Sequence, residues 1–335
     1  MAELDRAEQV DRTVTAQVAD AMIPASVDPD LTRLPVKRRL YAVDTYFRDS
    51  WEDLCRVAGE DALRLAGRHA FLLLKPDAVV RRRLSGALEW LAARGWRVVQ
   101  AKRFRVHRWA VRALWQYQWN TATRDRRDIA DLYMPATDSL VLLLRAPTDD
   151  ESACSALTRA KGGSDPASCR PGDLRYVLGT LNQQLNLVHS ADEPADLVRE
   201  VGICWTAAER AGVYESAARG IDAAQTAREL AAQLSEEHAQ LDLSLAGTVG
   251  RLLRRVDAAT DGGAELASLR RQLVGILAAE PSAWREVIAL ADRCAVPLSQ
   301  WERVVLGTFL LVPTLDGVVP LIPDASRLMR TSADQ

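Results

Sequence analysis

The fold of this chain is decided first by residues 69–77, HAFLLLKPD. The first six residues are almost wholly apolar, which predicts a short, fully buried strand rather than one that alternates apolar with polar side chains. Pro76 cannot donate to a sheet ladder, so the strand ends before it and leaves Lys75 at the strand's edge.

The elements predicted after this strand alternate between helix and strand. Residues 87–94 have apolar positions at helical spacing, and Gly95 follows as a C′ residue. Two further strands are predicted at residues 96–101 and 139–145. Between them lie two aromatic-rich helical pieces, at residues 109–120 and 126–133. A loop and another helix–strand element follow. This order predicts an α+β sandwich of the ferredoxin-like kind, with helices packed on a sheet.

Two regions flank the predicted sandwich. Residues 1–35 are polar and contain three prolines, which indicates a loose arm, and residues 37–67 have the helical spacing of an extension lying on the next domain. Residues 206–310 are rich in Ala, Leu, Arg and Glu, and predict an all-α C-terminal domain of about five helices. One of its apolar stripes runs through Leu230, Leu234, Leu241 and Leu245. The predicted domains are therefore residues 1–68, 69–205 and 206–335.

Composition argues against several classes of protein. The 335 residues have a formal net charge of −2, which gives no reason to expect nucleic acid or an anionic membrane as the main partner. The five cysteines are scattered without a CxxC pair, which indicates reduced thiols in a cytoplasmic protein and no structural zinc. No signal peptide is expected, because residues 1–12 are charged and lack an apolar core. The most apolar stretch, residues 304–323, is too interrupted by prolines to span a bilayer.

The chemistry is expected around residues 186–192, NLVHSAD. His189 is one of only four histidines, and Glu200 lies a short distance downstream. An imidazole held by a carboxylate is a good nucleophile, because the carboxylate fixes the ring's tautomer and stabilises the charge that develops on it. The alternative is a histidine at a strand end with no chemistry.

Residues 69–205 resemble the nucleoside diphosphate kinase family through five motifs in the right order. In this sequence the motifs are KPDA followed by VVRRRLSG at 75–86, SDPA at 164–167, PGDLR at 171–175, NLVHSAD at 186–192 and EVGIC at 200–204. The resemblance implies the family's fold and a ping-pong transfer of a phosphoryl group through a phosphohistidine. It covers under half of the chain and implies nothing about the two flanking regions.

The resemblance also implies a role for each matched residue. His189 would be the nucleophile, Glu200 would hold the far nitrogen of its ring, and Lys75 would neutralise charge at the transferring phosphoryl group. Three residues would bind the nucleotide: Arg175 and Ser164 its phosphate oxygens, and Asn186 its sugar hydroxyl and phosphate. Phosphoryl transfer needs positive donors around developing negative charge and an in-line nucleophile, and this set would supply both.

The chain departs from the family's pattern next to the nucleophile and in the phosphate site. Ala191 stands where the family has a serine that supports the histidine–glutamate pair, and Ser190 sits one place early. Thr158 occupies the position of a second phosphate-binding arginine. Arg159, its neighbour, would serve in that role after a shift of one residue.

The base-binding region departs most. The family stacks the base against an aromatic side chain, but here residues 105–133 have no clear register. Trp115, Tyr117 and Trp119 are available. We take Tyr117 as the ring that stacks on the base, and we expect substrate choice to differ from that of the family.

Together these observations predict a phosphotransferase. A nucleoside triphosphate, in the simplest case ATP, would phosphorylate His189, and the group would pass to a nucleotide or to a specialised small-molecule acceptor. Mg²⁺ would be held mostly by the nucleotide's own phosphates, so no metal ligands are assigned to the chain. The alternative is a catalytically degenerate nucleotide-binding or interaction module that acts through its C-terminal helices. A third hypothesis is an oligomerising scaffold, because members of the family commonly assemble as tetramers or hexamers.

Overall fold

The computed structural model describes residues 27–259 and 263–323. Most of the loose arm predicted for residues 1–35 lies outside the described residues, as does the charged start of the chain. Within the described ranges, no helix combines the length and the apolar character that crossing a membrane requires.

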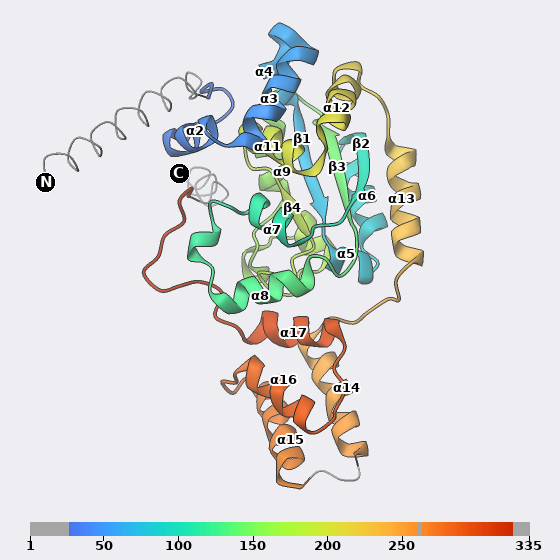
Figure 1. Ribbon diagram of the computed structural model, residues 1–335. Helices are drawn as coiled ribbons and strands as arrows, with labels where there is room; N and C mark the ends of the chain where they lie inside the picture. The colour runs from blue at the N-terminus through green and yellow to red at the C-terminus, as the bar shows by residue number, and fades with distance from the viewer. Residues whose placement is uncertain (1–26, 260–262, 324–335) are drawn as a thin grey trace, which may run out of the picture.

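A four-stranded antiparallel sheet forms the centre of the molecule (Figure 1). Its strands are β1 (His69–Leu74), β2 (Arg97–Phe104), β3 (Ser139–Arg145) and β4 (Val188–Ser190), in the order β2-β3-β1-β4. All of β1 is buried, because β3 and β4 pair with its two edges and helices pack against it. The predicted α+β class and ferredoxin-like order are confirmed, and β2 extends three residues beyond its predicted end.

Helices connect and cover these strands. The N-terminal extension forms α2 (Pro35–Ala42), α3 (Thr45–Ala58), a 3₁₀ turn (Gly59–Asp61) and α4 (Ala62–Arg68), which confirms the helical pattern predicted there. The sandwich contains α5 (Pro76–Val80), α6 (Leu84–Ala93), α7 (Arg108–Leu114), α8 (Arg124–Tyr133), α9 (Ala153–Lys161), α10 (Leu174–Leu178) and α11 (Pro194–Cys204), with 3₁₀ turns at Trp119–Thr121 and Pro166–Ser168. Of these, α9 and α11 pack against β1 together with α4.

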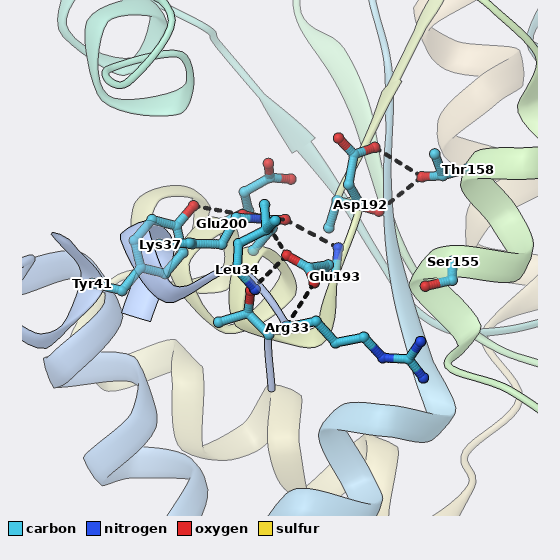
Figure 2. Close-up of polar contacts among 12 residues, drawn as sticks. Arg33, Leu34, Lys37, Tyr41, Ser155, Thr158, Asp192, Glu193 and Glu200 are labelled. Carbon is cyan, nitrogen blue, oxygen red and sulfur yellow. Dashed lines mark hydrogen bonds and ion pairs between the residues drawn. The ribbon is translucent and has the colours of Figure 1, made fainter. Parts of the chain in front are cut away.

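Buried ionic contacts hold the N-terminal extension to the start of α11 (Figure 2). Lys37 donates to Glu193 Oε2 at 2.6 Å and to Asp196 Oδ2 at 2.7 Å. Burial alone would lower the pKa of Lys37, but the two carboxylates raise it well above its usual value. Tyr41 adds a hydrogen bond to Asp196 and Thr32 adds one to Glu193. The position of α11 therefore depends on residues outside the sandwich.

The predicted C-terminal domain divides into two parts. Six helices follow the sandwich in the described residues: α12 (Ala207–Arg219), α13 (Ala224–Glu236), α14 (Leu245–Ala258), α15 (Gly263–Leu277), α16 (Trp284–Arg293) and α17 (Gln300–Leu310). Residues of α12 and α13 belong to the same hydrophobic core as the sheet, whereas α14, α15 and α16 build a second core, and α17 contributes residues to both. The predicted stripe from Leu230 to Leu245 is therefore not one helix, since residues 237–244 are non-helical.

Helices α12 and α13 cover β2, the outer strand of the sheet (Figure 1). Ala223 N donates to Val98 O at 2.8 Å, and Lys102 on the same strand pairs with Glu209 at 2.8 Å. An open strand edge is a template for pairing with another chain, and these contacts occupy it. Helices α12 and α13 therefore occupy part of the β2 edge that pairing with another strand would use.

Candidate active site

His189 lies on β4, opposite Leu73 of β1. Two hydrogen bonds of 2.9 Å lock the ends of these strands together, from Lys75 N to Leu187 O and from Leu187 N to Asp77 Oδ2. Leu187 has a φ of 69°, which a leucine rarely adopts, so the two bonds hold a strained backbone just before His189. The Lys-Pro-Asp motif thus positions β4 in addition to supplying a cation.

His189 and Glu200 form the contact that the sequence predicts. The distance from His189 Nε2 to Glu200 Oε1 is 2.8 Å, and burial raises the pKa of Glu200 although His189 acts to lower it. With a proton on Nε2 donated to the carboxylate, the lone pair lies on Nδ1, for which no hydrogen-bond partner is found among the described residues. The ring is therefore held by one nitrogen while the other is left for chemistry.

A cavity of about 300 Å³ opens beside this ring. Five of the predicted site residues line it: Lys75, Ser164, Arg175, Asn186 and His189. Glu200 lies behind His189, fully buried on α11. The structure therefore brings six of the eight predicted residues into one site.

Lys75 and Asn186 are hydrogen-bonded to each other in the cavity wall. Lys75 Nζ donates to Asn186 Oδ1 at 2.5 Å and to Gln184 O at 2.7 Å, and Asn186 Nδ2 donates to Gln183 O at 2.8 Å. Burial lowers the pKa of Lys75 to about 8. Buried ionisable groups with shifted pKa values are frequent at functional sites, where the bound ligand supplies the opposite charge.

Arg175 links the loop after α9 to the nucleophile strand. Its Nη1 donates to Gly162 O at 3.0 Å and its Nη2 to Val188 O at 2.7 Å. The guanidinium is thereby held in one orientation at the cavity wall, which suits the planar recognition of phosphate oxygens.

Two of the predicted nucleotide-binding residues are placed elsewhere. Tyr117 is buried and donates to Asp44 Oδ2 at 2.8 Å, with the Arg199 guanidinium over its ring, so its assignment as the base-stacking residue is wrong. Arg159 is exposed, pairs with Glu151 on the outer side of α9 and does not line the cavity, so its predicted shift is also wrong. Both side chains make contacts with other parts of the chain that the sequence motifs do not predict.

Other residues line the cavity that the sequence did not assign. They include Trp115, Trp119, Arg126 and Pro313, and also Lys161, which donates to Ser190. The Trp115 ring lies 5.1 Å from the His189 ring in an edge-on arrangement. Lys161 had one available signal: it follows Thr158 by three residues, and that spacing puts both on one face of a helix.

The carboxylate of Glu200 is incompletely paired. Its Oε2 is buried without a hydrogen-bond partner among the described residues. Ala191 stands two residues after His189, directly beyond the end of β4, and residues two apart in extended chain share a face, so we expect its side chain on the side of the His189–Glu200 pair. Ser190 points to the other face, where its hydroxyl accepts from Lys161. Ser190 therefore does not substitute for the hydroxyl that Ala191 lacks.

Replacing Ala191 with serine should supply a donor to Glu200 Oε2. An unpaired buried acceptor costs about 1–3 kcal/mol, so we expect phosphorylation of His189 to become faster by up to about 10-fold. The measurement is the single-turnover rate of phosphohistidine formation, with Ser190→Ala/Ala191→Ser as a second variant that isolates the new hydroxyl. An unchanged or lower rate in Ala191→Ser would contradict this account of the unpaired oxygen.

Comparisons with known proteins agree with the geometry. Residues 68–210 match the sequence profile of the family described as nucleoside diphosphate kinase. The nucleoside diphosphate kinase of Moorella thermoacetica is 28% identical over 149 residues, 43% of this chain and 99% of that protein. That of Thermococcus kodakarensis is 26% identical over 136 residues, 39% of this chain and 73% of that protein.

Among solved structures, an NDP kinase from Pyrobaculum aerophilum is similar to 42% of this chain and 96% of its own, with 18% identity and a TM-score of 0.37. The four-stranded sheet, the order of the motifs and the family match all concern the same segment. The segment from residue 68 to residue 210 is therefore similar to the nucleoside diphosphate kinase family, within a chain that continues on both sides of it.

Proposed function

We propose that this protein is a phosphotransferase that moves the γ-phosphoryl group of a nucleoside triphosphate through a phosphohistidine at His189 to a nucleotide or a specialised small-molecule acceptor. The observation that carries the proposal is the 2.8 Å contact between His189 Nε2 and the buried Glu200, beside a cavity lined with cations. A neutral ring with Nδ1 available is the state that a nucleophilic histidine requires.

The reaction follows from this arrangement in two steps. His189 Nδ1 attacks the γ-phosphorus, the bond to the β–γ bridging oxygen breaks, and the electron pair leaves with the nucleoside diphosphate. Glu200 stabilises the positive charge that develops on the ring. An oxygen of the acceptor then attacks the phosphorus, and the phosphorus–nitrogen bond breaks with return of its electron pair to Nδ1.

Positive charge around the cavity supports the transfer step. Lys75 and Arg175 would contact the phosphate oxygens, and their charges would stabilise the negative charge that develops in the transition state. Asp192 is the carboxylate that lines the cavity within the described residues, and its Oδ1 already accepts from Thr158. Mg²⁺ would therefore enter with the nucleotide, held by its phosphates, and supply further charge neutralisation.

The aromatic part of the cavity lining supports a specialised acceptor. Trp115 and Trp119 contribute aromatic side chains to the lining, Arg126 adds a cation, and Pro313 comes from the segment after α17. That segment is bound along residues 117–123 by backbone hydrogen bonds, among them Leu315 N to Thr121 O at 2.7 Å. The substrate's non-phosphate end would therefore contact a part of the chain that lies outside the family match.

The pKa of Lys75 predicts a pH dependence. Its folded pKa of about 8 lies below the usual 10.5, so the ammonium is present below pH 8 and is lost as the pH rises through that value. Because kcat/KM reports groups in the free enzyme, we expect it to fall above about pH 8. In Lys75→Arg, whose guanidinium stays charged, the fall should disappear even if the rate is lower. A profile of initial rates for both proteins checks this, and an unchanged alkaline fall in Lys75→Arg would assign it to another group.

The test of the proposed function is the intact mass of the purified protein after brief exposure to ATP and Mg²⁺. We expect a gain of one phosphoryl group that is labile to acid, as a phosphohistidine is. Nucleotide binding in calorimetry without this gain would instead support the degenerate binding module, for which the unpaired Glu200 oxygen and Thr158 are the motivating observations. We also propose a cytoplasmic location, supported by five free cysteines.

A further inference from the structure

Lys161 is a buried cation next to the nucleophile strand. It is the last residue of α9, its side chain is only 6% exposed, and it lines the cavity. Its Nζ donates to Ser190 Oγ at 2.6 Å and lies 3.7 Å from Asp192 Oδ1. Ser190 directly follows His189 on β4, and the Lys161 and His189 side chains both line the same cavity.

Thr158, one helical turn earlier, has a different task. Its hydroxyl donates to Asp192 Oδ1 at 2.9 Å and to Ala191 O at 3.3 Å, and so holds the turn that follows β4 (Figure 2). It is buried, does not line the cavity and carries no charge. Arg159 faces outward to Glu151. On the inner face of α9, the cation that reaches the cavity is therefore Lys161.

The charges around the cavity indicate the kind of ligand that would occupy it. In the described residues the lining contains Lys75, Arg126, Lys161 and Arg175, against one carboxylate, Asp192. An excess of positive side chains around a space of about 300 Å³ favours a ligand with several negative charges. A nucleoside triphosphate carries several negative charges, and the density of negative charge is highest at its γ-phosphoryl group.

We propose that Lys161 is a phosphate-binding residue, whose ammonium pairs with a non-bridging oxygen of the phosphoryl group at His189. Ser190 and Asp192 hold the ammonium in place before the ligand arrives, and one or more of its three N–H donors turn to the phosphoryl oxygen when the ligand binds. The ammonium would interact most strongly with the phosphoryl group in the transition state of transfer. It would therefore lower the barrier to transfer more than it strengthens ground-state binding. This inference rests on the proposed function, because it assigns a residue to that same site.

The test uses three variants of the full chain. Lys161→Gln keeps a hydrogen-bond donor toward Ser190 and removes the charge, Lys161→Arg keeps the charge, and Arg159→Gln is the matched control on the outer side of the same helix. The rate of phosphohistidine formation at saturating ATP is followed by quenched intact-mass measurement, and ADP affinity by calorimetry. Removing one pre-organised donor from a transition state typically costs about 10²- to 10³-fold in rate.

We expect that loss in Lys161→Gln, a loss below about 10-fold in Lys161→Arg, and a change below about 2-fold in Arg159→Gln, with ADP affinity within about 3-fold in all three. A residue that only supported the fold would lower ADP affinity and rate together. Transfer by Lys161→Gln within about 3-fold of the unmodified protein would overturn the proposal.

The experiment also separates this proposal from the proposed function. If the unmodified protein gains no phosphoryl group, the proposed function fails, and Lys161 is then tested by binding alone. In that case ATP should bind more weakly to Lys161→Gln than to the unmodified protein by about 10-fold or more, while ADP binding is unchanged. Equal ATP affinities would overturn the assignment of Lys161 to the γ-phosphoryl group.

Discussion

Replacement of His189 with glutamine should abolish phosphoryl transfer while leaving the protein folded. Glutamine retains an N–H that can reach Glu200, so the buried carboxylate keeps a partner. It has no nucleophilic nitrogen, and loss of the covalent nucleophile typically lowers turnover by about 10³-fold or more. Intact mass after exposure to ATP and Mg²⁺ should show no added phosphoryl group, and steady-state transfer should fall to background.

The matched control for this variant is His238→Gln. His238 lies in the non-helical segment between α13 and α14 and does not line the cavity, so its replacement should leave both measurements unchanged. His189→Ala provides a second variant in which Glu200 loses its partner. Residual transfer near that of the unmodified protein in either His189 variant would refute the phosphohistidine mechanism.

Replacement of Lys37 with methionine should lower the free energy of unfolding by about 3–5 kcal/mol, because it leaves two buried carboxylates without their cation. Glu193 and Asp196 are both nearly excluded from solvent and both accept from this ammonium. Methionine retains the apolar volume of the lysine stem, so the loss reports the charge rather than a cavity. Chemical denaturation followed by circular dichroism measures it.

The contribution of Lys37 should depend on pH in a defined direction. Burial raises the pKa of Asp196 but the contact with Lys37 outweighs this, and the pKa lies below the usual 3.8. A carboxylate with a lowered folded pKa stabilises the folded state above its unfolded pKa and loses that contribution as the pH falls through the folded value. The difference between Lys37→Met and the unmodified protein should therefore be constant near neutral pH and shrink below about pH 4.

The control for this prediction is Arg39→Met, two residues along the same helix and exposed. An exposed charge contributes little, so the change should be below about 0.5 kcal/mol. A loss in Lys37→Met no larger than that of Arg39→Met would mean that the buried pair contributes nothing net to stability.

The sheet was predictable from the sequence because each strand has its own local signal. The uninterrupted apolar run of β1 indicated a strand buried on both faces, and it is the strand that lies between β3 and β4. Fully apolar strands are typical of parallel sheets, but this sheet is antiparallel. Here β1 is buried because the surrounding helices cover it. The helices after the sandwich were predicted as helices, but amphipathic stripes alone do not say which core each helix joins.

The residues of the candidate site were predictable where the sequence motifs specify both the residue type and its spacing. His189, Glu200, Lys75, Asn186, Arg175 and Ser164 come from motifs with unbroken order, and the structure places them together. Tyr117 and Arg159 came from a region without register and from an assumed shift of one residue. In a helix a shift of one residue, from Thr158 to Arg159, turns a side chain by about 100°, so Arg159 faces outward, whereas Lys161, three residues after Thr158, returns to the inner face and lines the cavity.

By itself the sequence determined the sandwich, the order of its elements along the chain and the pairing of His189 with Glu200, because apolar periodicity and motif spacing are local properties of the chain. Only the tertiary structure decided that α12 and α13 cover β2, that Lys37 anchors α11, and that Pro313 and Lys161 reach the cavity. These features join segments that are far apart in sequence, and they depend on the direction in which each side chain leaves its helix or strand. Neither the partner nor the direction is encoded in a single segment.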